Sequence, residues 1–231
     1  MLDAILNLLF PVVCILCNSQ VFERRWGPVC PECWSKMAPL PRPFCKQCGM
    51  PAPAIEGLCG SCRLHEHAFD FARSVLLFND PVREVIHHLK YSDRVSLAKP
   101  LGKLLQDCLV QEGFQGELIA PVPLHRRRER QRGFNQAELL AAGTGLRVDS
   151  GILRRNRNTK SQTGLSRSQR ALNLAGAFQC CAIRVPKCVI VLDDVYTTGA
   201  TMHEVAKTLK RGGVERVEVL TVARVLRSET P

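Results

Sequence analysis

Eight cysteines near the start of the chain restrict what its first quarter can fold into, because they form four pairs that each enclose two residues. Two thiolates at this spacing can turn toward one tetrahedral metal ion, and two such pairs complete the four-thiolate shell of a structural zinc ion. The sequence therefore predicts a double zinc ribbon holding two zinc ions. Sequential pairing gives one site from Cys14, Cys17, Cys30 and Cys33 and a second from Cys45, Cys48, Cys59 and Cys62, with a cross-braced arrangement as the alternative.

Disulfides and a redox-active dithiol are the alternatives to zinc binding at such pairs. Disulfides are rare in the reducing cytoplasm, where we expect this chain, because the uncharged segment 4–22 is interrupted by polar residues and Pro11 and follows no basic region. The same features predict no transmembrane segment and a short helix over residues 2–10. A redox-active pair would not need four copies, so structural zinc is the favoured interpretation.

Two domains are expected. The cysteine-rich segment, residues 1–66, is too short and too rich in proline and glycine to fold by apolar burial alone. Residues 67–231 alternate between apolar strands and amphipathic helices, which predicts a Rossmann-like α/β domain with a parallel sheet covered by helices. The expected strands cover 68–79, 118–122, 187–193 and 216–225, and the expected helices cover 81–88, 96–111, 135–142 and 200–211.

The segment 189–201 concentrates the chemistry of the predicted α/β domain. Its sequence is Val-Ile-Val-Leu-Asp-Asp-Val-Tyr-Thr-Thr-Gly-Ala-Thr, a buried strand that delivers two acids to its carboxyl end, followed by a loop and a helix. Open α/β sheets bind ligands at that end. The hydroxyls of the loop, the close approach that Gly199 permits and the free amides of the helix start suit a phosphate group. Asp193 and Asp194 suit ribose hydroxyls and a magnesium ion, so the predicted ligand is a sugar phosphate.

This segment resembles the motif with which type I phosphoribosyltransferases bind 5-phosphoribosyl-1-pyrophosphate (PRPP) with magnesium. The resemblance implies a phosphoribosyltransferase-type fold in which Asp193 and Asp194 contact the ribose 2′ and 3′ hydroxyls. It also implies that the 5′-phosphate is held by Thr197, Thr198, Gly199, Ala200 and Thr201. A solvated loop after the strand is the alternative, but it leaves the order of threonines and glycine unexplained.

Positive charge gathers between residues 126 and 170, where twelve lysines and arginines face three acids, against a net charge of +11 for the whole chain. Such a concentration predicts an anionic partner, which can be a phosphorylated small molecule, a nucleic acid or an acidic membrane surface. The first basic cluster, 120–136, follows a predicted strand and matches the place of the pyrophosphate loop in the phosphoribosyltransferase fold. That match implies PRPP contacts from Val122, Pro123 and Leu124.

The order Arg-Gly-Phe-Asn-Gln at 132–136, together with the zinc knuckles, resembles the ComF family, which includes competence proteins and GntX-like proteins. The second basic cluster, 154–178, is also similar to ComF proteins and occupies the position of the flexible loop that closes over PRPP. Arg167 and Arg170 are accordingly predicted as catalytic residues beside Asp193 and Asp194, since they could offset charge on the departing pyrophosphate.

Two functions remain open from the sequence. The chain is either a phosphoribosyltransferase whose acceptor is unknown or a non-catalytic protein that binds single-stranded DNA and uses the pocket for a regulatory ligand. The ComF resemblance implies a role in DNA uptake or utilisation, with competence or DNA-processing proteins as further partners. The predicted nucleic-acid contacts are Arg126, Arg127, Arg128, Arg130 and Arg132, for which a solvated basic face is the alternative.

Overall fold

The computed structural model describes residues 12–22, 24–51, 57–92, 94–157 and 167–226. The helix predicted over 2–10 lies outside these residues. Within the described residues, the cysteine-rich segment contains little regular structure: one antiparallel hairpin with two residues in each strand, and three short helical segments. They are β1 (Val12–Val13), β2 (Gln20–Val21), η1 (Arg24–Trp26), α2 (Pro31–Ser35) and α3 (Gly60–Leu64).

A four-stranded parallel sheet forms the centre of the second part of the chain, with strand order β3-β8-β7-β4. Both faces of the inner strands are buried, so their apolar runs are continuous. On β7, Val189 and Val191 join the core on one face, while Ile190 and Leu192 join the core on the other. The strands are β3 (Phe71–Leu77), β4 (Leu118–Pro121), β7 (Cys188–Tyr196) and β8 (Arg216–Arg224).

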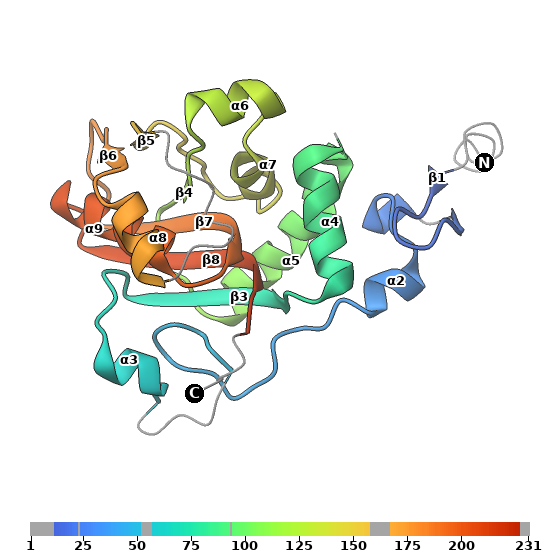
Figure 1. Cartoon of the computed structure of the whole chain (residues 1–231), viewed down its shortest axis with the longest axis horizontal. Helices are drawn as coiled ribbons and strands as arrows, with labels where there is room; N and C mark the ends of the chain where they lie inside the picture. The colour runs from blue at the N-terminus through green and yellow to red at the C-terminus, as the bar shows by residue number, and fades with distance from the viewer. Residues whose placement is uncertain (1–11, 23, 52–56, 93, 158–166, 227–231) are drawn as a thin grey trace.

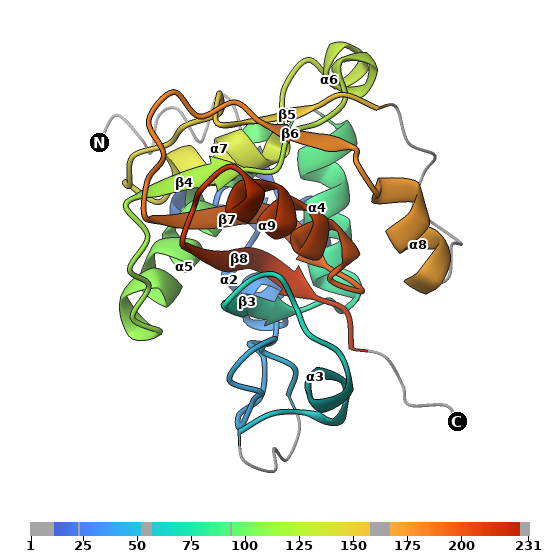
Figure 2. The same ribbon diagram turned by 90° about the vertical axis from the view of Figure 1, so that its left-hand side faces the viewer.

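Helices cover both faces of the sheet, which confirms the predicted α/β class (Figures 1 and 2). One face carries α5 and α7, which also contact each other, and the opposite face carries α9 together with the hairpin β5–β6 and α8. The bounds are η2 (Val95–Leu97), α5 (Ala98–Gln111), α7 (Gln136–Ala142), β5 (Leu153–Arg155), α8 (Arg167–Leu174), β6 (Phe178–Cys180) and α9 (Ala200–Arg211).

Helix α4 (Asp80–Tyr91) follows β3 after a two-residue connection and stands upright beside the end of the sheet at which β3 terminates (Figure 1). Its amino end is capped by Asn79, whose side chain accepts a hydrogen bond from the Val82 amide at 3.3 Å. The buried residues Val85, Ile86 and Leu89 pack into the core shared with α5. This anchoring brings the last turn of α4 to the carboxyl end of the neighbouring strands.

The structure departs from the predicted elements at several places. Helix α4 continues to Tyr91 rather than ending at residue 88, and β3 covers Phe71–Leu77 rather than residues 68–79. Strand β7 continues to Tyr196 rather than ending at Asp193, because β8 pairs with it through Tyr196 and Arg224. The arginine-rich segment forms helix α6 (Arg126–Arg132), which ends at Gly133 in the left-handed conformation. The second basic cluster contains the hairpin β5–β6 and α8. Neither basic cluster has the apolar periodicity from which the other helices and strands were predicted.

Candidate functional site

The eight cysteines assemble as two sets of four, in the sequential pairing. The four sulfur atoms of each set lie within 4.8 Å of one another. The sets are Cys14, Cys17, Cys30 and Cys33, and Cys45, Cys48, Cys59 and Cys62. All but Cys17 are buried. The second pair of each set opens a short helix, α2 after Cys30 and α3 after Cys59. Four converging thiols in a segment with few other core residues fit the closed shell of a structural zinc ion, so the predicted double zinc ribbon is confirmed.

The two zinc-ribbon sites lie in different surroundings. The first joins the core formed by α4 and α5, and Trp26 stacks on Trp34 beside it with ring centroids 4.9 Å apart. The second forms its own small cluster with Met50 and Leu58.

The acid pair lies near the carboxyl end of β7. Asp193 is partly buried, and Asp194 is only 4% exposed. Asp194 forms an ion pair with Lys90 from the last turn of α4 and accepts a hydrogen bond from the Gln136 side-chain amide at 3.4 Å. The Asp194 amide in turn donates to the Asp193 carboxylate at 2.9 Å. Three elements, α4, α7 and β7, therefore converge on this pair.

The two acids differ in the direction of their pKa shifts. Burial, and then the charge of Asp194, raise the pKa of Asp193 well above its usual value. Burial is the largest single influence on Asp194 and would raise its pKa, but the Lys90 ammonium together with hydrogen bonds from Asp193 and Gln136 holds the pKa of Asp194 below the usual value. Burial is also the largest single influence on Lys90, but the charge and hydrogen bond of Asp194, with the charge of Asp193, together raise the pKa of Lys90. In the ligand-free protein, Asp194 is thus the ionised member of the pair and Asp193 the one that holds a proton more readily.

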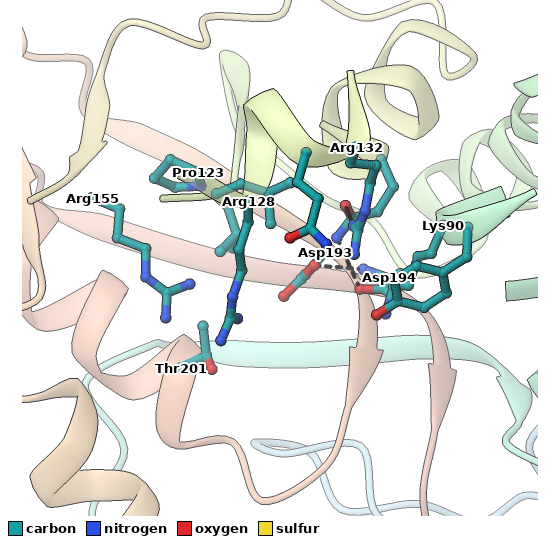
Figure 3. A pocket seen from close by; sticks show the side chains of 13 residues that line it. Lys90, Pro123, Arg128, Arg132, Arg155, Asp193, Asp194 and Thr201 are labelled. Atoms are coloured by element: carbon teal, nitrogen blue, oxygen red, sulfur yellow. Dashed lines mark hydrogen bonds and ion pairs between the residues drawn. The ribbon is translucent and has the colours of Figure 1, made fainter. Parts of the chain in front are cut away.

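Both acids line one cavity of about 630 Å³ (Figure 3). Figure 3 shows Arg128 and Arg155 reaching toward Thr201, Lys90 at the opposite end, and the two acids between. The complete lining is Lys90, Tyr91, Val122, Pro123, Leu124, Arg128, Gln131, Arg132, Gln136, Arg155, Asp193, Asp194 and Thr201. Four cations and two acids in one hollow suit an anionic ligand that also carries hydroxyls or a metal ion.

The loop between β7 and α9 turns sharply at Gly199 into the amino end of the helix. Gly199 precedes the first residue of α9 with φ of 77°, and a Cβ atom at this position would collide with the Tyr196 hydroxyl. Only glycine satisfies both conditions without strain. The Ala200 amide donates to the Thr198 hydroxyl at 3.3 Å, and Thr201 reaches the cavity. Thr197 is partly buried and is not part of the cavity lining.

Helix α6 divides the predicted nucleic-acid arginines into two groups. Arg128 and Arg132 line the cavity, and the Arg132 guanidinium lies 4.9 Å from the centre of the Tyr91 ring. Arg126, Arg127 and Arg130 are exposed and are not among the lining residues. Of the residues predicted for the pyrophosphate loop, Val122, Pro123 and Leu124 all line the cavity. Arg167 and Arg170 lie on α8, and their side chains fall outside the described part of the structure.

Five residues of the site were not singled out from the sequence: Lys90, Tyr91, Gln131, Gln136 and Arg155. Arg155 lies on β5 over the Phe178 ring, and burial, followed by the nearby Arg128, lowers its pKa. Gln136 belongs to the Arg-Gly-Phe-Asn-Gln run, which therefore contained a usable signal. Lys90 and Tyr91 end an ordinary amphipathic helix, and no local pattern shows that this helix reaches the end of β7.

Known proteins resemble the chain over nearly its whole length. A family model described as a double zinc ribbon domain matches residues 5–63. The chain is 34% identical over 228 residues to the DNA utilization protein YhgH of Escherichia coli O6:H1, a match that covers 94% of this chain and 98% of that protein. It is 30% identical over 224 residues to competence protein F of Haemophilus influenzae, covering 91% of this chain and 96% of that protein.

Among solved structures, a hypoxanthine phosphoribosyltransferase from Staphylococcus aureus shares 15% identity with a TM-score of 0.32, covering 57% of this chain and 74% of that one. None of the helices in the described ranges combines the length and the apolar character that crossing a bilayer requires.

Fold and site together define a protein that joins a double zinc ribbon to an α/β domain with an acid pair and a glycine-containing loop at the end of its central strand. With relatives of this similarity and coverage, the chain belongs to the ComF family.

Proposed function

We propose that the chain binds PRPP with magnesium in the cavity at the carboxyl end of β7 and acts in DNA uptake or utilisation. The observation that carries the proposal is that Asp193, Asp194 and Thr201 share one cavity with four cationic side chains. The names of the relatives, DNA utilization protein and competence protein, support the biological role. The cytoplasm, where PRPP would be available, is the proposed location.

Each part of the cavity suits one part of PRPP. The amides at the start of α9 and the Thr201 hydroxyl can hold the 5′-phosphate, while Asp193 and Asp194 can accept hydrogen bonds from the ribose hydroxyls. Arg128 and Arg132 supply positive charge for the pyrophosphate beside the backbone of Pro123. Magnesium would neutralise part of the pyrophosphate charge. Arg167 and Arg170 would act when α8 approaches the bound ligand.

Transfer of the phosphoribosyl group to an acceptor is the activity that this arrangement would support. Displacement at the anomeric carbon needs positioning and a stabilised leaving group rather than a covalent nucleophile. The cationic lining of the cavity meets the second need. The chemical identity of the acceptor is left to experiment.

Calorimetric titration of the zinc-loaded protein with PRPP, with and without magnesium, tests the proposal. We expect magnesium-dependent binding that is lost in Asp194→Ala and strongly weakened in Asp194→Asn. Asp107→Asn is the matched control, because Asp107 is a half-exposed acid on α5 whose partner is Lys103, away from the cavity. Equal PRPP affinity in wild type and Asp194→Ala would refute the assignment. Pyrophosphate release upon addition of candidate bases or DNA then tests for transfer.

A second candidate function, binding of single-stranded DNA, is favoured by the exposed arginines of α6. Arg126, Arg127 and Arg130 lie outside the cavity and are available to a polyanion. If DNA binding dominates, affinity for an oligonucleotide falls steeply with salt, and Arg127→Ala or Arg130→Ala each flattens the slope by about one unit. A slope that these changes leave untouched would argue against α6 as the contact surface.

A further inference from the structure

Arg224, the last residue of β8, is a buried cation with an unusual set of partners. The residue is 3% exposed, and its guanidinium donates to the Cys48 carbonyl at 2.6 Å and approaches the Cys48 sulfur at 3.7 Å. On its other side the guanidinium lies 4.1 Å from the centre of the Tyr196 ring. Within the described part of the chain, no carboxylate forms an ion pair with it.

A buried guanidinium requires a compensating negative charge, because desolvation of an unpaired charge costs several kcal/mol. The second zinc-ribbon site can supply it. Four thiolates around one zinc ion carry a net charge of about −2, and Cys48 is one of them. Arg224 therefore fits as the counter-ion of this site, and it contacts the ligand residue through both the backbone and the sulfur.

Tyr196 links Arg224 to the loop before α9. Tyr196 is 2% exposed and lies opposite Arg224 in the register of β7 and β8. Its hydroxyl lies so close to Gly199 that a Cβ atom there would collide with it. Gly199 begins the turn into α9, and Thr201, two residues later, lines the cavity. A continuous series of contacts thus runs from a zinc ligand through Arg224 and Tyr196 to the loop.

We infer that Arg224 is a positioning residue that couples the second zinc site to the phosphate loop, holding Tyr196 against Gly199 only while the zinc tetrathiolate balances its charge. The inference rests on the proposed function for its ligand, and it assigns the second ribbon a task in ligand binding beyond its own folding. Loss of this zinc ion would leave Arg224 buried without a counter-charge. The loop that Tyr196 fixes would then become more mobile, and affinity for a phosphate group would fall.

The zinc end of the coupling is tested with Arg224→Met. We expect the zinc affinity of one of the two sites to fall by about 10- to 100-fold, the range for loss of a partner of a ligand residue. In cobalt-substituted protein, the thiolate-to-cobalt absorption of that site should shift. Arg73→Met is the matched control: Arg73 also contacts the second ribbon, donating to the Lys46 carbonyl at 3.0 Å, and its ion-pair partner is Glu112 rather than a zinc ligand. We expect it to leave both signals unchanged.

The loop end is tested with ribose 5-phosphate as the probe, because its phosphate would occupy the loop, and with amide hydrogen exchange. Arg224→Met should weaken ribose 5-phosphate binding by about 2- to 30-fold and speed exchange at residues 197–201 without affecting residues 188–192 of β7. Tyr196→Phe removes only the hydroxyl that covers Gly199, so it should speed exchange in the loop while zinc affinity stays as in wild type.

Three outcomes decide the inference. It is overturned if Arg224→Met lowers zinc affinity yet leaves loop exchange and ribose 5-phosphate binding as in wild type, or if Arg73→Met has the same effects. If Arg224→Met does not fold, Arg224→Lys is used instead, since it keeps the charge but loses the planar guanidinium. Unchanged hydrogen exchange of the loop in both Arg224→Lys and Tyr196→Phe would then overturn the coupling. A wild-type protein that binds neither ribose 5-phosphate nor PRPP refutes the proposed function, while hydrogen exchange in the variants still reports on the coupling.

Discussion

Replacing Lys90 by methionine removes the positive member of the ion pair with Asp194 while keeping most of the side-chain volume. Asp194 is 4% exposed, and among the described residues it keeps the Gln136 amide, at 3.4 Å, and the Asp193 carboxyl group as side-chain partners. Breaking a buried pair on one side typically costs about 3–5 kcal/mol, because the remaining charge is uncompensated. The Lys90 side chain is 22% exposed, so some solvent relief is available. We expect a loss near the lower limit, about 3 kcal/mol.

Urea unfolding at pH 7 measures this loss, and a double-mutant cycle assigns it to the pair. Lys90→Met with Asp194→Asn leaves neither member of the pair charged, so it should recover at least about 2 kcal/mol relative to the single Lys90 variant. Lys103→Met serves as the control, since Lys103 is 63% exposed in its pair with Asp107 and should change stability by less than about 0.5 kcal/mol. Additive effects of the two changes, or a Lys90→Met variant as stable as wild type, would refute the expected coupling.

The same variant tests how the metal enters the proposed site. In the ligand-free protein, the Lys90 ammonium already neutralises Asp194, so a free divalent cation must displace it. Without Lys90, manganese alone should stabilise the protein in a concentration-dependent manner, as binding to the native state requires. In wild type we expect manganese to stabilise only together with pyrophosphate. Equal stabilisation of both proteins by manganese alone would show that Lys90 does not compete with the metal.

Three further predictions concern the acid pair, the ribbons and α6. Asp193→Asn should stabilise the ligand-free protein by about 0.5–2 kcal/mol at pH 7, because burial and Asp194 raise the pKa of Asp193. Thermal unfolding measures this gain in stability. The gain should vanish below about pH 4, where Asp193 is protonated in both the folded and the unfolded state. Protein purified without chelator should contain two zinc ions per chain, and less than one zinc ion per chain would contradict the two sites. Removing the zinc should unfold the ribbons while the sheet persists, which hydrogen exchange measures. Arg128→Met should weaken PRPP binding about tenfold or more through the loss of a charged hydrogen bond, whereas Arg127→Met, outside the cavity, should leave PRPP affinity unchanged in the same titration.

Most of the fold was predictable from the sequence because its signals are local. The apolar run before Asp193 marks a central strand, and the repeated cysteine spacing marks the ribbons. Helix α6 was not predicted, since seven mostly charged residues have no apolar face. It forms between His125, whose side chain accepts a hydrogen bond from the Arg127 amide at 3.3 Å, and Gly133 in the left-handed conformation. The residues at the two ends of α6 therefore determine where the helix begins and ends, and its interior sequence does not predict it.

The site was predictable only where its residues belong to one segment. Asp193, Asp194 and Thr201 follow one another along β7 and into α9, so their meeting could be expected. Lys90 reaches them from a helix whose first turn lies at the opposite edge of the sheet, after β3. Arg155 arrives on a three-residue strand of a separate hairpin. Contacts of this kind depend on how elements that are distant in the sequence pack together, and the spacing of residues along the chain does not predict this packing.

The balance of charge in the cavity bears on the choice between a sugar phosphate and a nucleic-acid strand. A groove evolved only for a polyanion gains nothing from acids, because each carboxylate repels the phosphates that the arginines attract. Here two acids lie among four cations, and burial together with Asp194 raises the pKa of Asp193, so ionised Asp193 carries a cost in stability that no backbone phosphate would repay. A ligand with vicinal hydroxyls and a bound metal ion satisfies both kinds of group. We therefore expect that PRPP with magnesium leaves oligonucleotide binding through the exposed arginines of α6 intact. Displacement of a bound oligonucleotide by PRPP would instead place the DNA strand in the cavity itself. That result would argue against a dedicated sugar-phosphate site.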